Sequence, residues 1–204
     1  MVESEAVLDE QMKAYAALVM QGSENAFAGL SQMVGQEIKA NFFSIRQVPL
    51  SEIPDLVGGR ESLAVAVYLA VNGCARGHVF LIYKPQTALE LVDMLLGDPP
   101  GTAQRIDEME ESALAEMGNI MASFFLNVLA DATNLDLKPS PPAVMMDMAG
   151  AILDVALADI MQESDTALAV EACFSTDSHN ITGTFLVLPT PELLRVLVSN
   201  WRVS

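Results

Sequence analysis

The chain has 204 residues, of which 51% are hydrophobic, and its net charge is −17, from 27 acidic and 10 basic side chains. This length and apolar content suffice for one domain with a hydrophobic core, whereas the acidic excess argues against nucleic acid and anionic membranes, because no basic patch can neutralise their phosphates. No uninterrupted apolar run approaches the roughly 18 to 20 residues of a membrane span, and the acidic start MVESEAVLDE is unlike a signal peptide, so we expect a cytoplasmic protein without membrane insertion.

In chain order, the first half predicts a long helix followed by strands and a second helix. Apolar residues recur at helical spacing over residues 9–34, and Gly22 interrupts them, which predicts a long or kinked helix. After the segment 38–48 come two predicted strands, ESLAVAVYLAV and GHVFLIY, joined by a short turn. The run KPQTALELVDMLLG (84–97) has proline in its first turn and ends at glycine, which is typical of a helix.

The second half returns to the same order after the linker 98–102. A long helix is expected to begin at Asp107, because Glu110 three positions later completes a capping box. The run VMMDMAGAILDVALADI reads as a strand in which Gly150 predicts a bulge or a bend. Two strands around TDSHN and a last helix, PELLRVLVSNW, complete this half.

The two halves are predicted to be repeats, residues 8–97 and 106–202. LSQMVGQEIK in the first half aligns with LADATNLDLK in the second, and FLIYKPQTALELV aligns with TFLVLPTPELLRV. Each long helix needs a sheet to bury its apolar side, and strands joined by hairpins are antiparallel. We therefore predict one α+β domain over residues 1–204, in which two pseudo-twofold-related repeats pack their long helices on one largely antiparallel β-sheet.

The cysteines and histidines do not indicate a metal or redox site. Cys74 and Cys173 belong to no CxxC pair, and His78 and His179 lie in or beside predicted turns without carboxylates or cysteines at ligand spacing. We expect reduced, structural cysteines, surface or strand histidines, and no metal or cofactor site of the chain's own.

The second long helix carries polar residues along one side. Ser112, Glu116, Asn119 and Ser123 follow at helical spacing, next to a stripe expected to face the core: Met109, Ala113, Met117, Ile120, Phe124 and Val128. A solvated helix face is the simpler interpretation of such a polar stripe. Two features argue for a functional face: no lysine or arginine pairs with Glu116, and Gly118, which costs about 1 kcal/mol relative to alanine in a helix, suggests close approach to the backbone.

This polar stripe resembles a known signature. The spacing Ser112-x3-Glu116-x2-Asn119, followed by Pro142, is similar to that of the CheC, CheX and FliY phosphatases of bacterial and archaeal chemotaxis. The segments IDEMEESALAEMGNI, DMAGAIL, LSQMVG and VPLSEIPDLVGG resemble CheC in particular, so the resemblance covers nearly the whole chain. It implies a hydrolase that removes the aspartyl phosphate from CheY, the response regulator of the flagellar motor.

The resemblance also implies roles for the motif residues. Asn119 would orient the attacking water through its carboxamide, and Glu116 would pair with a lysine of the partner and hold Asn119 in place. Ser112 would support the helix face or contact the partner, and Pro142 would shape the adjoining chain. The response regulator would itself supply the phosphoryl group, the Mg²⁺ and the lysine.

A second partner is implied by relatives that are stimulated by the receptor deamidase CheD. An acidic residue near DMAGAIL takes part in that contact, and Asp147 is the matching candidate here. An ordinary carboxylate in an exposed strand or loop explains Asp147 equally well.

The first repeat offers an internal comparison, because CheC-type proteins often carry the motif twice. In the gapless register the motif falls on Lys13, Ala17 and Met20, so we expect the first helix to be catalytically inert. Intact Glu116 and Asn119 favour a single-site phosphatase. The degenerate first helix keeps open a non-catalytic adaptor that binds CheD or a flagellar-switch component, whereas no motif supports a small-molecule-binding domain.

Overall fold

The computed structural model describes residues 2–176 and 181–200. In chain order the elements are α1 (Val2–Val34), β1 (Ile38–Pro49), the 3-10 helix η1 (Leu50–Val57), β2 (Leu63–Gly73), β3 (Gly77–Tyr83), α2 (Pro85–Leu96), α3 (Glu108–Thr133), β4 (Leu137–Pro139), β5 (Ala143–Met148), α4 (Ala149–Ile160), β6 (Thr166–Thr176), β7 (Thr182–Pro189) and α5 (Pro191–Asn200). The succession helix, strand, helix, two strands, helix occurs twice if β4 and β5 are counted together. The repeat boundaries at 8–97 and 106–202 remain a prediction.

The strands form one seven-stranded sheet in the order β1-β6-β7-β3-β2-β4, and β5 also pairs with β2. Every pairing in it is antiparallel. β2 and β3 form one hairpin and β6 and β7 form another, while the pairing of β3 with β7 joins the two halves of the chain at the centre of the sheet. The predicted α+β fold with one largely antiparallel sheet is confirmed.

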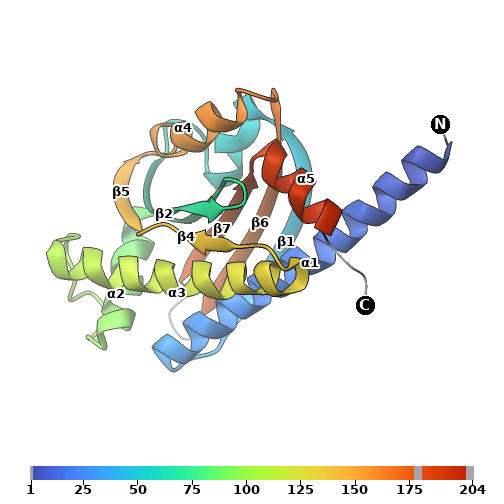
Figure 1. Ribbon diagram of the computed structural model, residues 1–204. Helices are drawn as coiled ribbons and strands as arrows, with labels where there is room; N and C mark the ends of the chain where they lie inside the picture. Colours follow the sequence, from blue (N-terminus) through green and yellow to red (C-terminus); the bar gives the residue numbers. More distant parts are fainter. Residues whose placement is uncertain (1, 177–180, 201–204) are drawn as a thin grey trace.

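Helices cover both faces of this sheet (Figure 1). Side chains alternate along a strand, so that Val65 and Val67 of β2 join one hydrophobic cluster while Ala64 and Ala66 join the other. The first cluster is closed by α1, α2, α3 and α5, and the second by η1 and α4. The two long helices α1 and α3 therefore lie in the same layer and contact each other.

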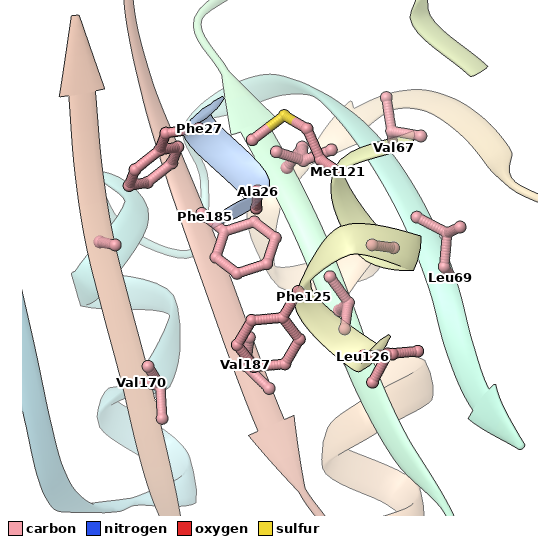
Figure 2. Close-up of a cluster of buried hydrophobic side chains, with 14 of the residues drawn as sticks. Ala26, Phe27, Val67, Leu69, Met121, Phe125, Leu126, Val170, Phe185 and Val187 are labelled. Carbon is pink, nitrogen blue, oxygen red and sulfur yellow. The ribbon is translucent and has the colours of Figure 1, made fainter. Parts of the chain in front are cut away.

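Aromatic side chains fill the space between α3, α1 and the centre of the sheet (Figure 2). The ring of Phe125 meets Phe185 of β7 edge-on, with centroids 5.3 Å apart, and Phe27 of α1 meets the same ring at 6.2 Å. All three side chains are buried. Because burial of one such side chain contributes about 1.5–3 kcal/mol, this contact fixes α3 firmly on the sheet.

Gly22 does not interrupt the first helix, since α1 continues through it from Val2 to Val34. A Cβ atom at Gly22 would lie 2.8 Å from Cδ2 of Phe125. The residue that suggested a kink in the sequence thus allows α1 and α3 to pack closely.

The prediction that a strand continues through Gly150 is wrong. β5 ends at Met148, and the following residues form α4, whose N-terminal Gly150 donates its backbone N–H to the carbonyl of Arg60 over 3.0 Å. Nearly all residues of this helix are apolar and many are buried, so its sequence shows no polar face from which a helical period could be recognised.

One described helix, α3, is long and apolar enough to cross a membrane by length and composition alone. In this fold α3 is a partly buried core helix that packs on the sheet and on α1.

Candidate functional site

The candidate site lies on α3, and the start of this helix is fixed as the sequence predicts. Asp107 is the N-cap, and its backbone N–H donates to Oε2 of Glu110 over 3.0 Å, which completes the capping box. Glu108, Glu110 and Glu111 place three carboxylates in the first turn, where they interact favourably with the helix dipole. The first turn of α3 is therefore both capped and strongly acidic.

The core-facing stripe of α3 differs from the predicted one. Met109 is 67% exposed and Phe124 is 39% exposed, and Phe124 lies against Gly29 of α1. The predicted stripe follows the side of α3 that is turned towards α1 and solvent, with only Met117 fully buried in it. The residues that bury α3 are Leu114, Met117, Gly118, Met121, Ala122, Phe125, Leu126, Leu129 and Thr133.

The polar stripe lies where the sequence places it, on an accessible side of α3. Ser112 and Glu116 are exposed, and Asn119 is partly exposed. Oγ of Ser112 donates to the carbonyl oxygen of Glu108 over 2.7 Å, so this hydroxyl is satisfied within its own helix. No described residue forms a hydrogen bond or an ion pair with the side chains of Glu116 or Asn119, and α3 itself contains no lysine or arginine. A carboxylate and a carboxamide thus stand side by side without a partner among the described residues.

Gly118 has a different role from the one inferred from the sequence. It is buried, and a Cβ atom there would lie 2.5 Å from Cγ1 of Val67 in β2. The close approach is made by the chain's own sheet and not by a partner. Because it has no side chain, Gly118 allows α3 to pack close to the sheet. This packing fixes the position of the backbone at Asn119, the next residue.

The other two predicted residues occupy separate places. Pro142 lies between β4 and β5, and both strands contact α3, so this segment borders the candidate site. Asp147 of β5 is exposed, and its Oδ1 accepts the backbone N–H of Met148 over 2.7 Å. Because side chains alternate, Asp147 points to the same face as Met145, which packs in the cluster of α4. Asp147 is therefore not brought together with Glu116 and Asn119.

A cavity of about 370 Å³ lies beside the first turns of α3, and sequence reasoning missed it. Four segments that are distant in sequence form its walls, so no local pattern could have revealed it. Its lining residues are Val65, Pro85, Leu89, Gln104, Arg105, Ile106, Glu111, Val144, Met145 and Met146.

A cluster of polar side chains lies on the face of the sheet that α4 covers, which is the face opposite to α3. The buried ring of His78 has Nδ1 3.1 Å from the hydroxyl of Tyr68 and Nε2 3.3 Å from Oδ2 of Asp159, whose Oδ1 pairs with Arg76 over 3.1 Å. Nε2 is close enough to Asp159 for an ion pair, but the geometry of this contact is not that of a hydrogen bond. Burial lowers the pKa of His78, and the carboxylate of Asp159 opposes this shift. His78 is thus a buried strand histidine, while His179 lies outside the described residues.

The described residues contain no group of three or more histidine, cysteine, aspartate or glutamate side chains that could hold a metal ion. Cys74 is exposed and Cys173 is partly buried, and burial raises the pKa of Cys173.

The fold defines a class of proteins. The crystal structure of FliY from Thermotoga maritima superimposes with a TM-score of 0.73, covering 94% of this chain and 95% of that chain at 14% identity. The CheX protein in the crystal structure of the CheX-CheY-BeF3-Mg²⁺ complex from Borrelia burgdorferi gives a TM-score of 0.57, covering 86% and 97% at 18% identity. At these identities the likeness shows the fold alone, which is that of the chemotaxis and flagellar proteins of the CheC, CheX and FliY type.

The sequence comparisons narrow this class. Residues 109–146 match the model of the CheC-like family, and this segment contains Ser112, Glu116, Asn119 and Pro142. The chain is 29% identical over 175 residues to the CheY-P phosphatase CheC of Bacillus subtilis (strain 168), covering 85% of this chain and 84% of that protein. The predicted resemblance to the CheC-type proteins is confirmed.

Proposed function

We propose that the chain accelerates hydrolysis of the aspartyl phosphate on a CheY-type response regulator through one site, formed by Glu116 and Asn119. The observation that carries this proposal is the pair itself: an accessible carboxylate and a partly exposed carboxamide on a rigid core helix, without a partner among the described residues. The CheC homology supports the reaction, and the CheX–CheY complex among the structural neighbours supports the kind of partner.

Asn119 is suited to position water. A carboxamide both donates and accepts hydrogen bonds, so it can hold a water molecule in line with the phosphorus atom of a docked phosphoaspartate. Its backbone is held in place because Gly118 lies against Val67 and because Met117 and Met121, on the turns before and after it, are buried. Such fixed placement lowers the entropic cost of the attack, which is the main contribution a protein can make to this reaction.

Glu116 is suited to bind a cation of the partner. It stands one turn before Asn119, and no lysine or arginine of α3 neutralises it. A lysine of the response regulator would supply the missing partner and fix the orientation of the two proteins. Ser112, already bonded to the carbonyl of Glu108, would support this face, and Pro142 would shape the segment that borders it.

The remaining chemistry belongs to the partner. The phosphoryl group and its Mg²⁺ are carried by the response regulator, so the chain needs no cofactor of its own in this proposal. Because such regulators act on the flagellar motor inside the cell, the proposal places the chain in the cytoplasm.

An adaptor function is the second candidate, and α1 favours it. At the positions that match Glu116 and Asn119, α1 presents Ala17, which is exposed, and Met20, which is 45% exposed. An exposed methionine is an adaptable contact surface for another protein. In this alternative the chain holds CheD, through Asp147, or a flagellar-switch component, and any hydrolysis is incidental.

The decisive measurement is the decay of the phosphorylated response regulator at fixed Mg²⁺, followed against the concentration of added protein. The wild type should accelerate the decay, and Asn119→Ala should remove the acceleration, by roughly a hundredfold or more as for other lost water-positioning groups. Asn127→Ala is the matched control, because Asn127 is an exposed asparagine of the same helix two turns further on.

The outcomes separate the two candidates. Loss of activity in Asn119→Ala with full activity in Asn127→Ala supports the phosphatase. Full activity in Asn119→Ala contradicts the proposed site. If the wild type has no activity with or without CheD but binds CheD, and Asp147→Asn weakens that binding, the adaptor is supported instead.

A further inference from the structure

The cavity beside α3 has an apolar interior and a polar rim. Val65 at its base is fully buried, and Leu89, Ile106 and Val144 are partly buried around it. The polar lining residues Gln104, Arg105 and Glu111 are all exposed. Since no buried polar group is available to orient a small ligand, the cavity lacks the fixed hydrogen-bonding groups typical of metabolite sites.

This cavity adjoins the candidate catalytic stripe. Glu111 lines it and directly precedes Ser112 on α3. Val144 of β5 also lines the cavity and pairs with Val67 of β2, the residue against which Gly118 packs. The cavity therefore lies beside the turn of α3 at which the polar stripe begins with Ser112, and Glu116 and Asn119 follow on the next turns.

The charges at the rim restrict what can bind. Nε of Arg105, the cation of the rim, lies 2.5 Å from Oδ2 of Asp107, so it is already paired with the N-cap residue of α3. Glu111 lies at the rim, and Glu108 and Glu116 are exposed on the neighbouring turns of α3; none of the three is paired with a described cation. A second copy of this chain, with its own net charge of −17, would bring like charges together here, whereas a surface with lysine beside an apolar residue is complementary.

We propose that this cavity receives an apolar side chain of the phosphorylated response regulator, of the size of leucine, methionine or phenylalanine, which lies next to the lysine that pairs with Glu116. This inference rests on the proposed function and adds to it a determinant of which regulator is accepted. The volume of about 370 Å³ is sufficient for one such side chain. Burial of an apolar anchor in a pocket surrounded by polar groups is the usual source of affinity in protein interfaces.

Met146 provides the test, because it lines the cavity and is 56% exposed, so that its truncation should not disturb the fold. Met148 is the matched control: it lies in the same strand, is 53% exposed and does not line the cavity. Binding would be measured with a CheY-type regulator of the same cell, loaded with beryllofluoride and Mg²⁺ so that no turnover occurs. We expect Met146→Ala to weaken binding about tenfold and Met148→Ala to change it less than about twofold, as for an anchor compared with a peripheral contact.

The decay assay with Asn119→Ala distinguishes the failure of this inference from the failure of the proposed function. Equal affinities of Met146→Ala and Met148→Ala overturn the pocket, even if Asn119→Ala shows that the phosphatase site is correct. A loss of binding in Met146→Ala together with full activity in Asn119→Ala would keep the pocket and overturn the site. If Met146→Ala instead lowers self-association in sedimentation experiments and leaves regulator binding unchanged, the occupant is a second copy and the proposal is wrong.

Discussion

Gly118 of α3 lies so close to Val67 of β2 that a Cβ atom on the glycine would be 2.5 Å from Cγ1 of the valine. This contact joins the candidate site to the sheet, because Asn119 follows Gly118 and Glu116 precedes it on the same helix. Leu81 of β3 closes the same contact, with Cδ1 3.4 Å from the added atom. The position of the two functional side chains is thus set by the packing of a residue that has no side chain.

The substitution Gly118→Ala separates packing from helix propensity. Propensity alone predicts a stabilisation of about 1 kcal/mol, whereas overpacking against Val67 predicts a loss of roughly 1–3 kcal/mol. We expect the loss, measured as the free energy of unfolding in urea. We also expect a fall in phosphatase activity, because Asn119 moves with the helix. An increase in stability at unchanged activity would contradict this account of Gly118.

Asp93 of α2 holds the linker that leads into α3. Its buried carboxylate accepts three backbone N–H groups, from Gly101 at 2.6 Å, Thr102 at 3.1 Å and Ala103 at 2.7 Å. In Asp93→Asn an amide group would face donors that need an acceptor, so we expect a loss of about 2–4 kcal/mol in the free energy of unfolding. Asp98→Asn, an exposed aspartate at the start of the same linker, is the control and should cost less than about 0.5 kcal/mol. Similar costs for the two variants would show that Asp93 is not an anchor.

His78 should make the stability of the protein depend on pH. Because burial lowers its pKa below the ordinary value of 6.5, the unfolded chain binds more protons at this residue than the folded chain does once the pH falls below about 6.5. Protonation therefore favours unfolding, and the free energy of unfolding should fall on acidification from about pH 7.5 to 5.5, by at most about 1.4 kcal/mol per pH unit from this group.

The variant His78→Gln tests this expectation through the slope and not through the absolute stability, since the substitution also disturbs the contacts with Tyr68 and Asp159. We expect a flatter dependence on pH in His78→Gln than in the wild type, measured by urea unfolding at several pH values. The carboxylate of Asp159 raises the pKa of His78, so Asp159→Asn should lower this pKa further. The loss of stability on acidification should then extend to lower pH than in the wild type. Parallel slopes in all three proteins would contradict a lowered pKa.

The parts of the fold that the sequence predicted are those with local signals. The capping box of Asp107 and Glu110 places the start of α3, and the proline and glycine around α2 place its ends. The sequence of α4 predicts a strand because a largely apolar helix lacks the polar face that reveals its period. The predicted core stripe of α3 differs from the observed one for a related reason. α3 is apolar towards the sheet and also towards α1, and spacing alone does not show which of these two sides is more deeply buried.

The candidate site was predicted from spacing along a single helix, and such spacing does determine which side chains share a face. What spacing could not give was the surroundings of that face. The role of Gly118 depends on Val67 of β2, and the cavity depends on α2 and β5 as well as on β2, all of which are distant in sequence from the motif. The catalytic roles of Glu116 and Asn119 themselves remain a prediction that the decay assay tests.

The first helix permits a constructive test of the site. Ala17 and Met20 are accessible, so Ala17→Glu with Met20→Asn should fold, and Asn119→Ala in the same chain ensures that any activity comes from α1. We expect this combination to be inactive while Lys13 remains, because a lysine four residues before the new carboxylate would pair with it and compete with the lysine of the regulator. Addition of Lys13→Ser, which reproduces the full motif, should give a measurable acceleration of phosphate decay. Equal rates of phosphate decay with and without Lys13→Ser would show that pairing between Lys13 and the new glutamate does not control activity. If both of these rates are high, the carboxylate and the carboxamide suffice on either helix.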